Sequence, residues 1–169
     1  MLSLHHSKLF LNPGIAIGKT TLLCGYTIGF ACEKNEPVVV LNINSTLLHR
    51  DYKRVKRILN ETDSFEGLTI EYYDGSVLEE RMLTSLINFM VPQQLLMTRL
   101  PQKYHLIIDE FHNCFFNAGI FELLPIFNKA MTLMAMSGSP LEKDKINFIQ
   151  EATTASCVVL FKDEYPFNC

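Results

Sequence analysis

The run Pro37–Asn42 constrains the fold more than any other segment of the chain. Its sequence, Pro-Val-Val-Val-Leu-Asn, contains four consecutive apolar residues, and β-branched runs of this kind are typical of strands that are buried on both faces. Tyr104–Ile108 is a second such run. Strands with two buried faces occur in parallel sheets that carry helices on either side. The sequence therefore predicts an α/β fold with three layers, α/β/α, and a mostly parallel sheet.

Further apolar runs and amphipathic segments alternate along the chain, as crossover units require. We expect additional strands at Lys8–Leu11, Leu68–Tyr73, Met131–Met136 and Cys157–Phe161. We expect helices at Lys19–Glu33, Thr46–Asn60, Val77–Phe89, Ile120–Lys129 and Leu141–Glu151. In such folds, ligands bind at the carboxyl ends of the strands. Four polar residues follow strand ends and are expected to share that edge: Asn12, Asn44, Asp109 and Ser137.

Length and composition exclude several classes of protein. The chain has 169 residues, 48% of them hydrophobic, and a net charge of −3, which is typical of one globular domain rather than of a disordered or broadly basic protein. No apolar run is long enough to span a bilayer, so we expect no membrane partner. The five cysteines show no Cys-x-x-Cys spacing. We therefore expect reduced thiols, no zinc site and an intracellular, cytoplasmic location.

The segment Phe10–Thr21 has the order of a strand, a glycine-containing loop and the start of a helix. Backbone N–H groups of such a loop surround the β-phosphate of a nucleotide, and the positive end of the helix faces the anion. A lysine then reaches the β- and γ-phosphates, and the hydroxyl that follows it ligates Mg²⁺. The residues expected to bind ATP in this way are Pro13, Gly14, Ala16, Ile17, Gly18, Lys19, Thr20 and Thr21.

One position of this loop departs from the phosphate-loop pattern Gly-x-x-x-x-Gly-Lys-Ser/Thr. Pro13 stands at the first glycine position, and Gly14 follows one residue late. Either Gly14 supports a different entry turn, or nucleotide binding is impaired. The alternative is an ordinary strand-to-helix turn, and a magnesium-binding carboxylate at the right place in the chain favours the nucleotide site over it.

Such a carboxylate is present at the end of the second buried run. Asp109 and Glu110 follow Ile108 directly, and His112 lies two residues further on. A carboxylate beside the phosphates holds Mg²⁺, so Asp109 and the Thr20 hydroxyl are the expected metal ligands. Glu110 can accept a proton from the attacking water, and His112 can sense the γ-phosphate. The alternatives are a solvated helix cap at the two carboxylates and a histidine without a specific role.

Three segments resemble sequence motifs of one known family. Gly18–Thr20, Asp109–His112 and Ser137–Pro140 are similar to motifs I, II and III of superfamily-two helicases of the Asp-Glu-x-His branch. The resemblance implies a RecA-like P-loop NTPase domain that uses ATP and Mg²⁺, with the acidic motif as its catalytic centre. It also implies that the hydroxyls of Ser137 and Ser139 couple ATP hydrolysis to movement.

Nucleic-acid contacts are expected from the segment that follows the first buried run. Val38–Thr46 occupies the position of the family's motif Ia, which touches the nucleic-acid backbone, so Ser45, Thr46 and Arg50 are the expected contacts of RNA or DNA. A basic run extends this surface along the predicted helix: Arg50, Lys53, Arg54, Lys56 and Arg57. These cations either meet phosphates or form a solvated helix face. Val91–Leu96 is similar to motif Ib but lacks its threonine and its arginine.

The family also carries a second RecA-like lobe that supplies arginine fingers, and we expect that lobe to be absent from residues 1–169. On this interpretation the chain is one partial or divergent ATP-binding lobe. It would be an ATP hydrolase that works weakly unless a second lobe is supplied in trans.

Three other interpretations stay open at this point. Leu47–Tyr52 is similar to the Leu-x-x-Arg-Asp segment of SecA-like motor ATPases, which move polypeptide rather than nucleic acid. A non-catalytic binding module would retain the nucleotide fold and use the same edge for a protein partner. A signalling ATPase of the nucleotide-switch type is disfavoured, because that class has paired aspartates where this chain has Asp109 and Glu110.

Overall fold

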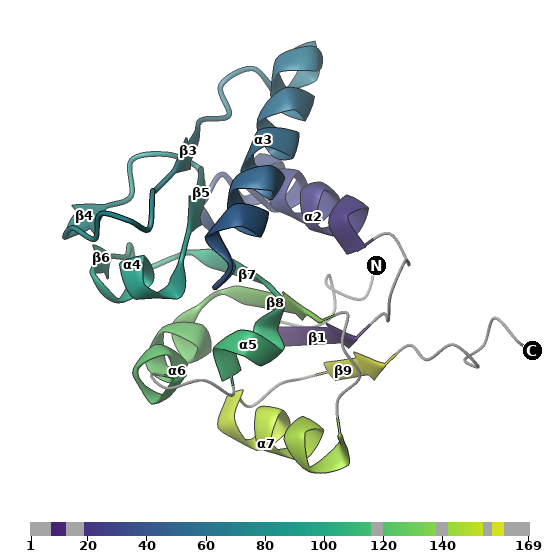
Figure 1. Cartoon of the computed structure of the whole chain (residues 1–169). Helices are drawn as coiled ribbons and strands as arrows, with labels where there is room; N and C mark the ends of the chain where they lie inside the picture. The colour runs from purple at the N-terminus through teal and green to yellow at the C-terminus, as the bar shows by residue number, and fades with distance from the viewer. Residues whose placement is uncertain (1–7, 13–18, 116–119, 138–141, 154–156, 161–169) are drawn as a thin grey trace, which may run out of the picture.

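The computed structural model describes residues 8–12, 19–115, 120–137, 142–153 and 157–160, and its centre is a seven-stranded sheet (Figure 1). The strand order is β3-β5-β2-β7-β8-β1-β9, and every pair of neighbours is parallel. The strands of this sheet are β1 (Lys8–Asn12), β2 (Val38–Leu41), β3 (Ile70–Tyr72), β5 (Ile87–Met90), β7 (His105–Asp109), β8 (Thr132–Met136) and β9 (Cys157–Leu160). The predicted parallel α/β architecture is confirmed.

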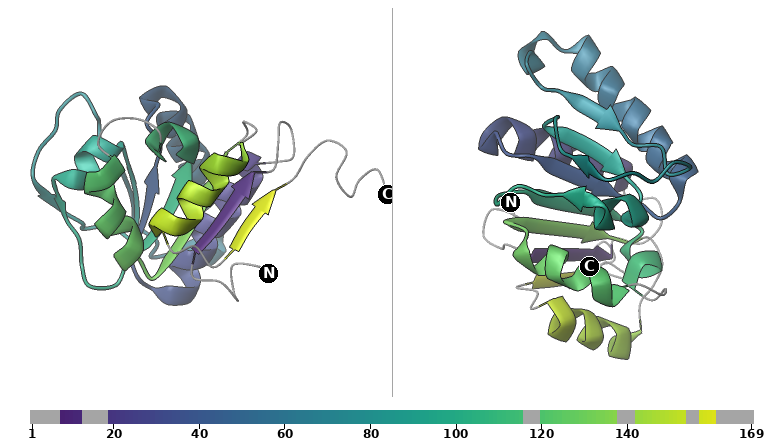
Figure 2. Two further views of the ribbon diagram at one scale, coloured as in Figure 1. Left: turned by 90° about the horizontal axis from the view of Figure 1, so that it is seen from below. Right: turned by 90° about the vertical axis from the view of Figure 1, so that its left-hand side faces the viewer.

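Helices cover both faces of this sheet, which gives three layers (Figure 2). The helices are α2 (Lys19–Lys34), α3 (Ser45–Glu61), α4 (Pro92–Leu96), α5 (Phe111–Phe115), α6 (Ile120–Lys129) and α7 (Lys143–Thr153), with a short 3₁₀ turn η1 (Asp63–Phe65). The first two helices lie on one face, and the side chains that α4 to α7 bury belong to the core on the other face. Among the described helices, none combines the length and the apolar character that crossing a bilayer requires.

The side chains of β2 alternate between two apolar cores, one on each face of the sheet. Val38 and Val40 pack in the core beneath α2 and α3, whereas Val39 and Leu41 pack in the core beneath α4, α5, α6 and α7. All four side chains are fully buried. The burial of this run on both faces, predicted from its sequence, is therefore confirmed, and it places β2 in the interior of the sheet.

The prediction of a helix at Val77–Phe89 is wrong. This segment contains a turn, the short strand β4 (Arg81–Met82) and most of β5, which pairs with both β2 and β3. Val77 and Met82 in this segment are 52% and 63% exposed. Pairing of β5 with two neighbouring strands therefore outweighed the local preference for a helix.

A reciprocal side-chain contact holds the turn segment against α4. The Gln94 side chain is buried; its Nε2 donates to the Glu79 carbonyl at 2.7 Å, and its Oε1 accepts from the Glu79 N–H at 3.3 Å. Nearby, β4 pairs with β6 (Thr98–Arg99) in a separate two-stranded sheet. The turn segment, α4 and the two-stranded sheet thus form a small region beside the main sheet, and the Gln94 amide connects two of its parts.

We expect Gln94→Met to lower the free energy of unfolding by about 1–3 kcal/mol, because the substitution retains side-chain length and removes the partners of two backbone groups. Chemical denaturation measures this change. Gln93→Met is the matched control, since Gln93 is exposed in the same helical turn. Equal stability of the two variants would contradict an anchoring role for the amide.

Candidate functional site

The carboxyl ends of β2, β7 and β8 bring three polar residues to one edge of the sheet. Leu41 pairs with Ile108, so Asn42 follows beside Asp109. Asp109 in turn pairs with Met136, and Ser137 follows that residue. The Ser137 N–H donates to the carbonyl of Leu11, 3.0 Å away on β1. The shared edge expected for Asn44, Asp109 and Ser137 is present, and β1 ends on it at Asn12.

The start of α2 lies on the same side of the sheet as this edge. Five of the expected nucleotide-binding residues lie outside the described residues: Pro13, Gly14, Ala16, Ile17 and Gly18. Helix α2 begins at Lys19, directly after these residues, with Thr20 half-buried and Thr21 exposed in its first turn. Because β1 ends at the carboxyl edge, the positive end of α2 belongs to the same side of the sheet as Asp109.

Asp109 is held by a buried amide that the sequence did not single out. Asn42 is fully buried, and its Nδ2 donates to Asp109 Oδ2 at 3.4 Å. Its Oδ1 accepts from the N–H of Asn44 at 2.9 Å, and Asn44 caps α3 by accepting from the N–H of Leu47 at 3.1 Å. A chain of hydrogen bonds therefore connects the Asp109 carboxylate to the first turn of α3.

A second buried carboxylate touches Asp109 from α3. Asp51 lies on the buried side of α3 with Leu48 and Val55, and its carboxyl group is within hydrogen-bonding reach of that of Asp109. Burial, followed by the charge and the hydrogen bond of Asp109, raises the pKa of Asp51 from 3.8 to about 6. Arg50 opposes this rise in pKa, since its Nη2 donates to Asp51 Oδ1 at 3.4 Å.

Glu110, His112 and Ser137 form a second group at the same edge. Glu110 has a positive φ of 55°, which is uncommon for a residue other than glycine. His112 Nδ1 lies 3.6 Å from Glu110 Oε2 and 2.6 Å from the hydroxyl of Ser137, with which it shares a hydrogen bond. The second and third helicase-like motifs are therefore in direct contact. Ser139, the other expected coupling residue, lies outside the described residues.

The expected nucleic-acid contacts lie on α3. Ser45 and Thr46 are exposed in its first turn, and the Arg50 side chain is 51% exposed. The remaining basic residues of α3 are exposed as well: Lys53, Arg54, Lys56 and Arg57. The structure thus places a basic helix face beside the carboxyl edge.

Two residues of the site were missed by the sequence analysis, Asn42 and Asp51. Asn42 ends the apolar run of β2, where a polar residue is unremarkable. Asp51, however, stands three residues after Leu48 and four before Val55. This spacing puts a carboxylate on the apolar side of an amphipathic helix, which is a signal of a buried functional charge that the sequence did contain.

The oxygen donors at this edge fit Mg²⁺. The metal usually takes one or two protein oxygens and completes its shell with water and substrate phosphates. Asp109 and the half-buried Thr20 supply a carboxylate and a hydroxyl of that kind. Among the described residues, no cluster of three or more His, Cys, Asp and Glu side chains is arranged to hold a metal by itself.

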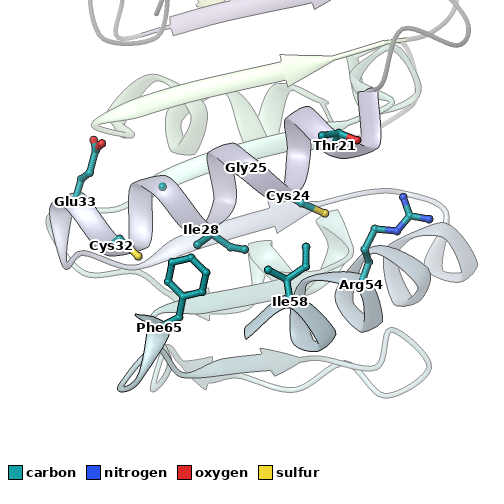
Figure 3. Close-up of a pocket in the computed structure, with 10 residues that line it drawn as sticks. Thr21, Cys24, Gly25, Ile28, Cys32, Glu33, Arg54, Ile58 and Phe65 are labelled. Carbon is teal, nitrogen blue, oxygen red and sulfur yellow. The ribbon is translucent and has the colours of Figure 1, made fainter. Parts of the chain in front are cut away.

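A groove of about 530 Å³ between α2 and α3 is separate from these groups (Figure 3). Its lining is mostly small or apolar, with Arg54 reaching from α3 towards the end of α2 that carries Thr21. A Cβ atom added at Gly25 or Gly29 would meet nothing within 4 Å. Among the described residues expected to hold ATP, Thr21 lines this groove, whereas Asp109 does not.

No family model and no curated protein sequence matches the chain, but solved helicase cores match its fold. A Dbp5 variant from S. cerevisiae bound to RNA and ADP BeF3 gives a TM-score of 0.75 at 11% identity, over 93% of this chain and 42% of that one. The UvsW helicase from bacteriophage T4 gives 0.63 at 14% identity, over 91% and 54%. The Sulfolobus solfataricus SWI2/SNF2 ATPase core in complex with dsDNA gives 0.54 at 17% identity, over 86% and 30%.

The chain has the RecA-like fold. This RecA-like domain spans 42%, 54% and 30% of the three helicase-core chains just described. In it, Asp109, Ser137 and the start of α2 all lie at the carboxyl edge of the sheet, which is where parallel α/β folds bind their ligands.

Asp51→Asn tests the buried charge beside Asp109. Because the native pKa of about 6 exceeds the ordinary 3.8, the folded protein retains a proton that the unfolded chain releases, so the free energy of unfolding falls between about pH 4 and pH 6. A pKa change of about 2 corresponds to at most about 3 kcal/mol. Asparagine cannot ionise, so we expect the variant to lose this fall in stability and to be more stable than the wild type at pH 8.

Urea unfolding across this pH range measures the effect, and Asp63→Asn is the control because Asp63 is exposed. Curves of wild type and Asp51→Asn that run parallel from pH 4 to pH 8 would contradict the assignment of a buried, titrating Asp51.

Proposed function

We propose that this RecA-like domain is the ATP-binding lobe of a helicase or translocase of the Asp-Glu-x-His type. The observation that carries the proposal is the contact of Glu110, His112 and Ser137 beside the buried Asp109 at the carboxyl edge. Motifs II and III of that family are the segments that meet here. Support also comes from the likeness to helicase ATPase cores, two of which were solved with RNA or with dsDNA.

In the proposed mechanism, the loop that ends at Lys19 holds the phosphates of ATP. Asp109 and Thr20 hold Mg²⁺, which when bound neutralises the charge on the β- and γ-phosphates. Glu110 accepts a proton from the attacking water. His112 fixes the Glu110 side chain from 3.6 Å and ties it to the Ser137 hydroxyl.

The backbone of Glu110 supports a role in chemistry. A positive φ in a residue with a side chain costs free energy, and such strain persists where the surrounding structure imposes it, as at active sites. Here β7 ends at Asp109 and α5 begins at Phe111, so Glu110 alone makes the turn between them. The turn directs its carboxylate towards His112.

The proposal includes partners. Exposed cations on α3 supply a surface for the phosphates of RNA or DNA. A second RecA-like lobe, from another part of the same polypeptide or from a partner chain, would supply the arginine finger for efficient hydrolysis. Without it we expect ATP binding and weak hydrolysis.

A polypeptide motor of the SecA type is the second candidate function. That resemblance depends on the pair Arg50 and Asp51. The pair adjoins Asp109, the carboxylate proposed to hold Mg²⁺, so it would belong to the ATPase site in either class of motor. Stimulation of ATP turnover by single-stranded RNA or DNA supports the helicase class, and stimulation only by unfolded polypeptide supports the other.

Lys19→Ala is expected to weaken binding of a fluorescent ATP analogue with Mg²⁺ by about 10- to 100-fold, because the phosphates lose a charged donor. Lys34→Ala, at the opposite end of α2, controls for the loss of a lysine and should bind as the wild type does. Equal affinity of both variants would contradict the phosphate-loop assignment. Absence of binding in every protein would favour a non-catalytic module.

Glu110→Gln should leave nucleotide affinity unchanged and reduce ATP hydrolysis by about 10²- to 10⁴-fold, because the amide cannot accept the proton. Phosphate release measures the rate. Glu122→Gln is the control, since Glu122 is exposed on α6. Hydrolysis by Glu110→Gln at the wild-type rate would show that another group is the base.

A further inference from the structure

Arg50, Asp51 and Asp109 form a line from solvent to the proposed metal site. The Arg50 side chain is 51% exposed and its Nη2 lies 3.4 Å from Asp51 Oδ1, whereas Asp51 is 1% exposed. The carboxyl group of Asp51 is also within hydrogen-bonding reach of that of Asp109, which is 4% exposed. One buried carboxylate therefore separates a solvent-exposed guanidinium from the carboxylate that is expected to hold Mg²⁺.

We propose that Asp51 is a positioning residue for Asp109, and that the Arg50–Asp51 pair links a nucleic-acid phosphate bound outside the domain to the metal bound inside it. This inference rests on the proposed function, because it requires Mg²⁺ and ATP at Asp109. It assigns a role to two residues that lie outside the phosphate loop and outside the acidic motif.

The link has two states, defined by the partner of Arg50. In the first state the guanidinium pairs with Asp51, as the structure shows. In the second it pairs with an external phosphate, for which a guanidinium is well suited because its donors match the oxygen geometry. Arg50 is at the start of the exposed basic face of α3, so a strand that lies along this face reaches Arg50.

The sign of the coupling follows from the charges. When the two buried carboxyl groups are both ionised they repel each other, and a cation near either of them relieves the repulsion. When a phosphate draws Arg50 away, Asp51 loses its counter-ion and the pair of carboxylates attracts Mg²⁺ more strongly. Nucleic acid therefore raises the affinity for Mg²⁺, and by reciprocity bound Mg²⁺ raises the affinity for nucleic acid.

Asp51 is suited to this role by its rigid setting. It projects from a helix whose first turn is capped by Asn44, and Asn42 connects that cap to Oδ2 of Asp109. Movement of the Arg50 side chain thus changes the charge balance at Asp109 without moving the backbone that holds it.

The first experiment omits nucleotide and measures the affinity for a short fluorescein-labelled oligo(U) by anisotropy at pH 8. Asp51 competes with phosphate for Arg50, so Asp51→Asn should bind oligo(U) about fivefold more tightly than the wild type. In an Arg50→Gln background the same substitution should have no effect, because the guanidinium for which Asp51 competes is absent. In a Lys53→Gln background the gain should persist, since Lys53 supplies an exposed charge on the same helix.

The second experiment titrates Mg²⁺ into the protein with a fluorescent ATP analogue, with and without saturating oligo(U). The wild type and Lys53→Gln should require about fivefold less Mg²⁺ when oligo(U) is present. Asp51→Asn should show no such response. Arg50→Gln should bind at the lower Mg²⁺ concentration from the start, because its Asp51 has no counter-ion.

The outcomes separate the inference from the function on which it rests. A wild type that binds no nucleotide contradicts the proposed function, and the link with it. If the wild type binds nucleotide but oligo(U) does not change the Mg²⁺ concentration it requires, the link is overturned and the proposed function is not. The same holds if the wild type binds no oligo(U). A response to oligo(U) that survives in Asp51→Asn overturns it as well.

Discussion

Parallel pairing of every strand in the main sheet is the constraint on which the rest of the structure depends. Parallel neighbours need crossovers that return the chain to the same starting edge, so all the carboxyl ends meet at the opposite edge. That geometry alone brings Asn42, Asp109 and Ser137 together from segments separated by up to ninety-five positions in the sequence. The apolar runs of β2 and β7 make this edge rigid, because their side chains are buried on both faces.

Buried polar groups have different kinds of partner at the two edges of the sheet. At the amino end of β7, His105 is buried, and its two ring nitrogens contact Thr132 at 2.6 Å and Glu36 at 3.0 Å. Those partners satisfy the imidazole, as a stable core requires. At the carboxyl end, Asp51 instead adjoins a second carboxylate, and its pKa rises. Two buried carboxyl groups so close together are an arrangement that a bound cation would stabilise, and this supports the proposed Mg²⁺ site at that edge.

How far the sequence predicts this molecule depends on the range of the interactions. Asp109, Glu110 and His112 were predicted to lie together because a strand end is a local feature, and the contact of His112 with Ser137 follows once their strands are neighbours. The segment Val77–Phe89 was misread because the pairing partners of β5 lie far away in the sequence. Asn42 escaped notice for the same reason. Which residue faces Asp109 is decided by the register between β2 and β7, and no local pattern encodes that register.

Asp51 makes the protein less stable than an apolar residue at the same position would. An apolar residue of similar volume between Leu48 and Val55 would complete the buried stripe of α3 and remove the repulsion with Asp109. The chain instead has a carboxylate that is only partly compensated by an exposed arginine. Natural proteins tolerate such losses where activity needs them. The loss of stability arises where α3, with its basic face, adjoins the end of β7. In the proposed motor, this is where the surface that binds nucleic acid would be connected to the site that hydrolyses ATP.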